Sequence, residues 1–150
     1  MRKAWILAAT LLLAGSTLAA DIGLIKVSNG NVRIERGEAK LAAGVGAGLQ
    51  IADVIVTGAD GSAGITFTDN SLVSIGPNSV FAIDKYQFDS TTHVGEFEGS
   101  LKQGRLAAIS GKMVKQSPET MKIRTPSAVM GVRGTEFVVQ VEEPRTAVKP

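Results

Sequence analysis

Two glutamates come closest to enzyme chemistry in this chain. Glu96 and Glu98 alternate along a predicted strand, which puts both carboxylates on one face, roughly 7 Å apart. Glycosidases place their acid and base at such a separation. The sequence offers no aromatic platform for a sugar beside them, since the intervening Phe97 points to the opposite face. We interpret both glutamates as solvated edge charges and predict no catalytic residues and no enzyme activity.

Metal and nucleophile chemistry has still less support. His93 is the single histidine and lies in a polar loop near Asp89, so it offers at most a weak zinc or proton-transfer site. The chain contains no cysteine and no Gly-x-Ser-x-Gly elbow. Asp53, Asp60 and Asp69 are seven and nine residues apart, too sparse for a calcium-binding loop. We expect these aspartates to stabilise turns and predict no metal and no cofactor.

A sharp corner near the C-terminus is the most suggestive feature. Thr125 and Pro126 fit an N-cap followed by proline at the first helical position, so Ser127 to Met130 are predicted to form one helical turn. Glycines shortly after can adopt positive φ and let a partner approach the backbone. The candidate binding residues are Thr125, Pro126, Gly131, Arg133, Gly134 and Thr135.

Arg133 has two open roles in this corner. Its guanidinium can tie carbonyls or a carboxylate of neighbouring strands, with Asp53, Asp60 or Asp69 as acceptor, or it can contact a partner. We favour the structural role, because buried charges must be paired. In that role Arg133→Ala is expected to cost roughly 1–3 kcal/mol and several degrees of thermal stability.

Two further segments are candidates for contact with other molecules. Four basic residues cluster near Gly111, namely Lys112, Lys115, Lys122 and Arg124. They would face an anionic envelope polymer such as lipopolysaccharide or a teichoic acid, or form a solvated sheet face, which we favour because outward charges protect edge strands. The small-residue stretch Leu41 to Gly48 is predicted to be a loop, either a lid that contacts a partner or a connection without such a role.

The charge balance restricts the partners. The chain has 16 basic and 14 acidic residues, and Arg2 and Lys3 account for the net charge of +2. The remaining body is neutral, so it lacks the basic excess that attracts nucleic acids and anionic membrane surfaces. We therefore predict no nucleic-acid partner.

Residues 1–20 are predicted to be a secretory signal peptide that is cleaved after Ala19 or Ala20. Arg2 and Lys3 form its positive region, and Trp5 to Leu13 its apolar core. That core is shorter than the roughly 20 residues that span a bilayer. We predict no membrane span after cleavage and a periplasmic or secreted location in a bacterial envelope.

The body of the chain, residues 21–144, is predicted to be one all-β domain, with a flexible tail over 145–150. Apolar residues alternate at period two between turn signals such as Asn29-Gly30. Expected strands include Ile51–Val56, Ala63–Thr68, Leu72–Ile75, Val80–Ile83 and Met121–Thr125, and Glu96–Ile109 as a strand pair or one long strand bent around Gly104. Short strands at regular spacing favour a jelly-roll-like β-sandwich of mostly antiparallel strands. A short two-sided β-solenoid has the same pattern and remains open.

The corner also carries a family resemblance. The segment Thr125 to Val139, TPSAVMGVRGTEFVV, resembles the signature of the FecR domain family. The stretches Asp53–Gly61 and Thr66–Ser79 are similar to the family's strand-turn and the strand that follows, with Asn70 where glycine is usual. Asparagine tolerates the left-handed conformation of such a turn. The resemblance extends from Gly46 to Val141 and implies a jelly-roll-like, all-β domain on the periplasmic or extracellular side.

The resemblance also implies a kind of function. In the best-known FecR proteins, regulators of iron uptake, this domain receives a signal from an outer-membrane receptor, and a transmembrane helix passes it to a cytoplasmic segment that binds a sigma factor. We expect neither that helix nor that segment here. We predict an exported, non-enzymatic binding or scaffold module that contacts a protein partner in envelope signalling or surface organisation. A strand edge, or the corner from Thr125 to Thr135, would supply the contact. The alternative is a carbohydrate-binding or cell-wall-associated structural module, supported by fold analogy alone.

Overall fold

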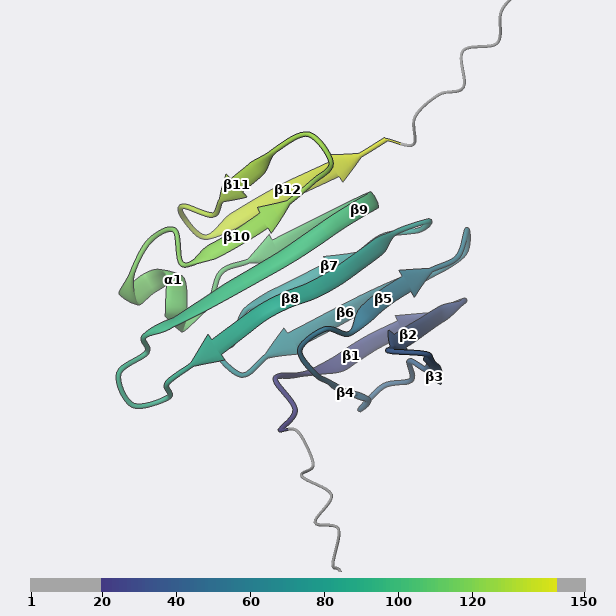
Figure 1. Ribbon diagram of the computed structural model, residues 1–150, viewed down its shortest axis with the longest axis horizontal. Helices are drawn as coiled ribbons and strands as arrows, with labels where there is room; N and C mark the ends of the chain where they lie inside the picture. The colour runs from purple at the N-terminus through teal and green to yellow at the C-terminus, as the bar shows by residue number, and fades with distance from the viewer. Residues whose placement is uncertain (1–19, 143–150) are drawn as a thin grey trace, which may run out of the picture.

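The computed structural model describes residues 20–142, which contain twelve strands and one short helix (Figure 1). The strands are β1 (Gly23–Asn29), β2 (Val32–Arg36), β3 (Ala39–Ala42), β4 (Gly48–Leu49), β5 (Val54–Thr57), β6 (Ser62–Phe67), β7 (Leu72–Ile75), β8 (Val80–Phe88), β9 (Gly95–Ile109), β10 (Met121–Arg124), β11 (Val129–Gly131) and β12 (Glu136–Val141). The helix, α1, covers Lys112–Gln116. The predicted tail and all but the last residue of the predicted signal peptide lie outside the described residues.

The strands follow the period-two pattern of the sequence. In β6 and β7 the buried side chains are Ala63, Ile65, Phe67, Val73 and Ile75. Successive side chains of a strand point to opposite faces, so each of these strands has one face in the core and one face outward. The expected strand Leu72–Ile75 is confirmed residue for residue.

The strands form one hydrogen-bonded sheet that is folded along β9. Its order is β3-β2-β5-β8-β9-β7-β6-β1-β4, while β10 and β12 also pair with β9, and β11 pairs with β10. The first part of β9 pairs with β8 and β10, and the part from Gly104 onward pairs with β7 and β12. We call these parts of the sheet the β8 half (β2, β3, β5, β8, the first part of β9, β10 and β11) and the β7 half (β1, β4, β6, β7, the last part of β9, and β12).

Gly104 makes the bend in β9 possible. Its φ is +94°, in the region that glycine adopts without steric cost. A Cβ at this position would collide with Ser79, which precedes β8. The Ser79 hydroxyl donates to Pro77 O and accepts from Arg105 N, which fixes the bend against the neighbouring chain. Of the two alternatives predicted for this segment, one long strand bent around Gly104 is confirmed and a strand pair is wrong.

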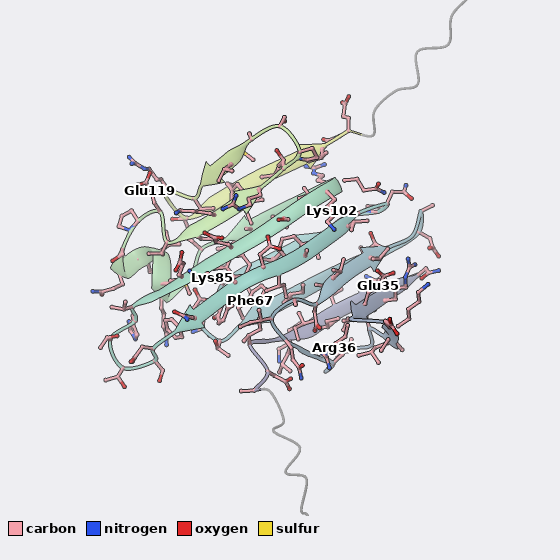
Figure 2. All side chains as sticks on the ribbon, in the orientation of Figure 1. Glu35, Arg36, Phe67, Lys85, Lys102 and Glu119 are labelled. Atoms are coloured by element: carbon pink, nitrogen blue, oxygen red, sulfur yellow. The ribbon has the colours of Figure 1, made fainter. Side chains whose placement is uncertain are left out.

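The two halves face each other across the core. Phe67, labelled in Figure 2, belongs to the β7 half. It contacts Tyr86 and Phe97 of the β8 half, with ring centroids 5.4 and 4.9 Å apart. All three side chains are buried. In Figure 1, β8 and the first part of β9 lie in front of β6 and β7. Burial of these apolar residues holds the folded sheet closed.

The prediction of an all-β fold is confirmed. The ladders are antiparallel, except that β10 runs parallel to β9, and the sheet curls into a half-barrel. A β-solenoid stacks its strands in parallel ladders, so that alternative is wrong. The twelve described strands belong to one continuous sheet, and the jelly-roll sandwich stays a prediction.

Two local predictions are wrong. Ser127 to Met130 do not form a helical turn: Thr125 N donates to Ala128 O at 2.8 Å, which closes a tight turn between β10 and β11. Thr125 Oγ1 accepts from Ala128 N, so the threonine caps this turn instead of a helix. The strand expected from Ile51 begins only at Val54, after a turn.

The remaining differences concern the ends of strands and one short helix. The strand expected over Val80–Ile83 continues to Phe88. The predicted loop Leu41–Gly48 is shorter, because β3 ends at Ala42 and β4 begins at Gly48. The helix α1 was not predicted; it follows Gly111 and buries Met113 and Val114. In residues 20–142, no helix has the length and hydropathy needed to cross a membrane.

Candidate functional site

The predicted corner, Thr125 to Thr135, contains the β10–β11 turn, β11 and the link to β12. Thr125 and Pro126 lie in the turn, while Arg133 and Gly134 lie beyond the other end of β11. Gly134 has a φ of +95°, as the sequence suggested. The candidate residues therefore form two separate groups, one at each end of β11.

Arg133 lies on the surface. Its side chain is 73% exposed, and Nη2 and Nε lie 2.6 and 2.8 Å from Glu119 Oε1. A carboxylate does pair with Arg133, but it is none of the three aspartates proposed as internal acceptors. An exposed ion pair contributes about 0.2–1 kcal/mol, so the structure lowers the expected cost of Arg133→Ala to that range.

The three aspartates hold turns and strands together, in line with the turn-stabilising role predicted from the sequence. Buried Asp53 accepts two hydrogen bonds of 2.8 Å from Arg36, and this contact raises the pKa of Arg36. Buried Asp69 accepts from Ser71 N and from its hydroxyl. Asp60 accepts from the backbone of the β1–β2 turn at 3.3 Å.

The glutamate pair of β9 is engaged by cations. Lys85 Nζ lies 2.8 Å from Glu96 Oε2, and this hydrogen bond holds the pKa of Glu96 below its usual value. Arg124 Nη2 lies 3.7 Å from Glu98 Oε2. Both carboxylates therefore face cations, an arrangement that suits an outer sheet surface better than a general acid.

The basic cluster is divided between two elements. Lys112 and Lys115 lie on α1, and both are exposed. Lys122 and Arg124 lie on β10, where Glu96 and Glu98 of the adjacent β9 balance their charge. The structure thus does not present these four residues as one basic patch.

His93 lies in the β8–β9 loop. Its ring stacks on Phe88 with a centroid distance of 6.0 Å, and its backbone N donates to Asp89 O. In the described part of the chain, no three His, Asp or Glu side chains converge to hold a metal ion.

A groove of about 760 Å³ lies between the β10–β11 turn and β12. We call it the seam groove; it is lined by Lys102, Thr125–Ala128, Met130 and residues 138–142. Buried Val139 and partly buried Met130 and Val141 give it an apolar floor. Two of the predicted binding residues, Thr125 and Pro126, thus line the seam groove. Gly134 and Thr135 line a separate, smaller pocket of about 150 Å³ beside α1, and Gly131 and Arg133 line neither.

The outer edge of β12 is unpaired along this groove. Within residues 20–142, β12 pairs with β9 alone. Ser110 N donates to Thr135 O, so every second residue from Thr135 directs its backbone groups toward β9. The backbone N–H and C=O of Val138 and Gln140 therefore point away from β9, on the groove side of the strand.

Sequence reasoning missed the contribution of β12 and Lys102 to this surface. The sequence marks β12 as a strand with Pro144 shortly after it. Which edge of β12 is free depends on its pairing with β9, about thirty residues earlier in the chain. No local pattern reports that pairing.

Comparison with known proteins gives one match. A family model described as FecR protein matches residues 53–149. The comparisons with curated proteins and with solved structures give no match. The matched segment includes β5 to β12, and so both the bent strand β9 and the seam groove.

Proposed function

The chain belongs to the FecR family, and from this premise we propose that it is an exported, signalling-related regulatory module that binds a protein partner in the seam groove. FecR domains are regulatory domains, periplasmic in family members, and theirs is not a known enzyme family. The carboxylates nearest to a catalytic spacing, Glu96 and Glu98, face cations. This arrangement supports binding as the function.

One observation carries the proposal: an unpaired strand edge runs along an apolar groove. An extended segment of a partner can add to the β12 edge by hydrogen bonding to the backbone of Val138 and Gln140. Alternate side chains of that segment would then pack over Met130 and Val141. The backbone bonds would supply affinity, and the apolar floor would supply specificity.

The β10–β11 turn forms the opposite wall of the groove. Thr125 holds this turn through both its backbone and its hydroxyl, so the wall is fixed before a partner arrives. Preorganisation of this kind lowers the entropy cost of binding. This gives Thr125 and Pro126 a role in shaping the groove.

A sugar-binding function has less support. Aromatic side chains provide the apolar platforms on which ring-shaped ligands stack. None of the described residues that line the seam groove is aromatic. Glycan binding is therefore an outcome against which the proposal is tested.

Capture from envelope extract tests the proposal, with Ala128→Arg as the test variant and Ala39→Arg as its control. The Ala128 side chain is exposed at the groove wall, and only its backbone holds the turn, so arginine fills the groove without breaking the turn. Ala39 is equally an exposed alanine, on β3 at the far edge of the sheet. Binding to purified peptidoglycan and lipopolysaccharide is measured in parallel.

We expect one stoichiometric protein partner that Ala39→Arg retains and Ala128→Arg loses. Hydrogen exchange at Val138 and Gln140 should slow when this partner is bound, because both amides become hydrogen-bonded. Equal capture by the two variants, or saturable glycan binding without a protein partner, would contradict the proposal.

A further inference from the structure

The outer face of the β7 half consists largely of small and apolar residues. The ladders place Val27, Gly64, Ser74, Ala107 and Val138 side by side in one row across β1, β6, β7, β9 and β12. A second row contains Leu24, Thr66, Leu72 and Ile109 and ends at Glu136 on β12. Four large apolar residues of this face, Val27, Leu72, Ile109 and Val138, are between 41% and 52% exposed. Contiguous exposed apolar surface of this kind marks a site of protein association.

Charged residues stand at the margins of this face. Lys26 lies in the bulge of β1, between the residues that pair with Ile65 and Gly64. Glu136 lies on β12 at the opposite margin. Arg105 lies at one end of the face, opposite Gln140. The centre of the face therefore carries no charge that docking would desolvate.

We propose that this face binds a second copy of the same chain, around a two-fold axis that runs along β7 parallel to the strands. Such an axis places β1 of one copy over β12 of the other, so that Val27 packs on Val138 and Leu72 on Leu72. Lys26 and Glu136 are then offset along the strands by less than two residues, about 5 Å, which the lysine side chain can span.

The charges select this axis over its alternative. A two-fold axis perpendicular to the strands would place β1 over β1 and β12 over β12, so that Lys26 lies nearest to Lys26, and Glu136 nearest to Glu136, of the other copy. Like charges that face each other destabilise an interface, whereas the parallel axis forms two Lys26–Glu136 pairs. Of these two axes, the one parallel to the strands is the one that pairs Lys26 with Glu136.

The size of the face sets the strength of the dimer. Five strands spaced about 4.8 Å apart, over about five residues, cover on the order of 400 Å² in plan. Stable interfaces bury about 800 Å² per partner. The expected dimer is therefore weak and reversible, with a dissociation constant in the micromolar range or above.

Sedimentation of the full gene product, as the cell processes it, tests the proposal across concentrations from about 10 µM to about 1 mM, the range of weak interfaces. The test variant is Leu72→Glu, and the matched control is Leu41→Glu. Leu41 is 37% exposed and Leu72 42%, and each lies in a four-residue strand, but Leu41 is on β3 of the other half. Circular dichroism checks that both variants keep the β spectrum.

We expect a concentration-dependent dimer in the wild type and in Leu41→Glu, and a dissociation constant at least about tenfold higher in Leu72→Glu, equivalent to about 1.4 kcal/mol. Lys26→Glu and Glu136→Lys should each weaken the dimer, and the double variant should restore it. A monomer at every concentration, or a dimer that Leu72→Glu leaves intact, overturns the proposal. Failure of the double variant to restore association overturns the proposed axis. Leu72 does not line the seam groove, so this test is separate from partner capture.

Discussion

The outer faces of the two sheet halves lie on opposite sides of one core and differ in how they carry charge. On the β8 half the charges are interleaved in pairs: Arg33–Glu35, Lys85–Glu96 and Arg124–Glu98. On the β7 half they stand at the margins, around a centre of small and apolar residues. A partner that covers the β8 half must desolvate paired charges, whereas one that covers the β7 half does not.

This difference shows why composition alone does not locate a contact surface. Apart from Arg2 and Lys3 the chain is electrically balanced. The fold distributes this balanced set unevenly, with ion pairs on one face and few charges on the other. Figure 2 shows Glu35, Lys85 and Lys102 on the β8 half, the side toward the viewer. The positions of the charged residues in the fold, more than their total number, distinguish a face that stays solvated from a face that can bind a partner.

The largest predicted loss of stability comes from a substitution in the bend of β9, which places the outer faces of the two halves on opposite sides of the core. Gly104→Ala combines positive φ with a collision against Ser79, which we expect to lower the free energy of unfolding by about 2–4 kcal/mol. Gly134→Ala is the matched control, since its φ is +95° but nothing lies within 4 Å of an added Cβ. Its expected cost is about 1 kcal/mol, from backbone strain alone. Urea denaturation measures both, and equal losses would show that the bend does not depend on close packing at Gly104.

A smaller loss of stability is predicted on removal of the Tyr86 hydroxyl, which lies between the two halves. The Tyr86 hydroxyl bonds Thr68 Oγ1 at 2.7 Å and accepts from Asp69 N at 3.1 Å. Tyr86→Phe leaves these groups without that partner, so we expect a loss of about 1–3 kcal/mol at pH 7 in denaturant unfolding.

The same tyrosine predicts a dependence on alkaline pH. Burial raises the pKa of Tyr86 to about 12, so the folded state favours the neutral phenol. Its contribution is complete below the ordinary value of 10 and is lost as the pH rises toward 12. Tyr86→Phe should therefore flatten the decline in melting temperature between pH 9 and pH 12. An unchanged decline would indicate that another group controls it.

A still smaller effect is predicted at the corner. Arg133→Ala removes one exposed ion pair with Glu119 and should lower stability by about 0.2–1 kcal/mol. Thermal unfolding in low and high salt measures this difference, which salt should reduce. A loss of several degrees that salt does not change would restore the interior role that the sequence suggested.

The smallest effect on thermal stability is expected on the outer face of the β8 half, where Lys85 and Glu96 form an ion pair. Because Lys85 lowers the pKa of Glu96, this pair stabilises the fold above the ordinary glutamate value and ceases to do so as the pH falls through the lowered one. Glu96→Gln should therefore reduce the acid-induced fall in melting temperature slightly, between pH 5 and pH 3. A larger fall in this variant than in the wild type would contradict the assigned pair.

Parts of the fold were predictable because their signals are local. The alternation of β7 and the glycine at position 104 indicated a strand and a bend without knowledge of their neighbours. The corner was misread for the same reason: Thr125-Pro126 fits a helix start as well as a hairpin turn, and pairing of β10 with β11 decides between them. A short sequence pattern therefore predicts the local conformation only where that pattern is compatible with a single structure.

The contact surfaces were not predictable, because they depend on pairing between distant segments. The seam groove needs β10, β11 and β12 placed around β9, and the apolar face needs β1 aligned with β12 through three intervening strands. Arg133 finds Glu119, fourteen residues away, and not the aspartates that the sequence offered. The alternation of apolar and polar residues predicts which side chains point outward. It does not predict which of these side chains lie next to each other on the folded surface.

The central claim is that the protein binds other proteins through the seam groove and through the outer face of the β7 half, here called the apolar face. Site-specific photo-crosslinking in the envelope of the producing cell tests this claim. A photoreactive phenylalanine analogue is placed singly at Ser127 in the groove wall, at Leu72 on the apolar face and at Lys85 on the paired face. The account predicts a discrete adduct with another protein from Ser127, an adduct of twice the chain mass from Leu72, and none from Lys85. Adducts from Lys85 alone, or from none of the three positions, would contradict it.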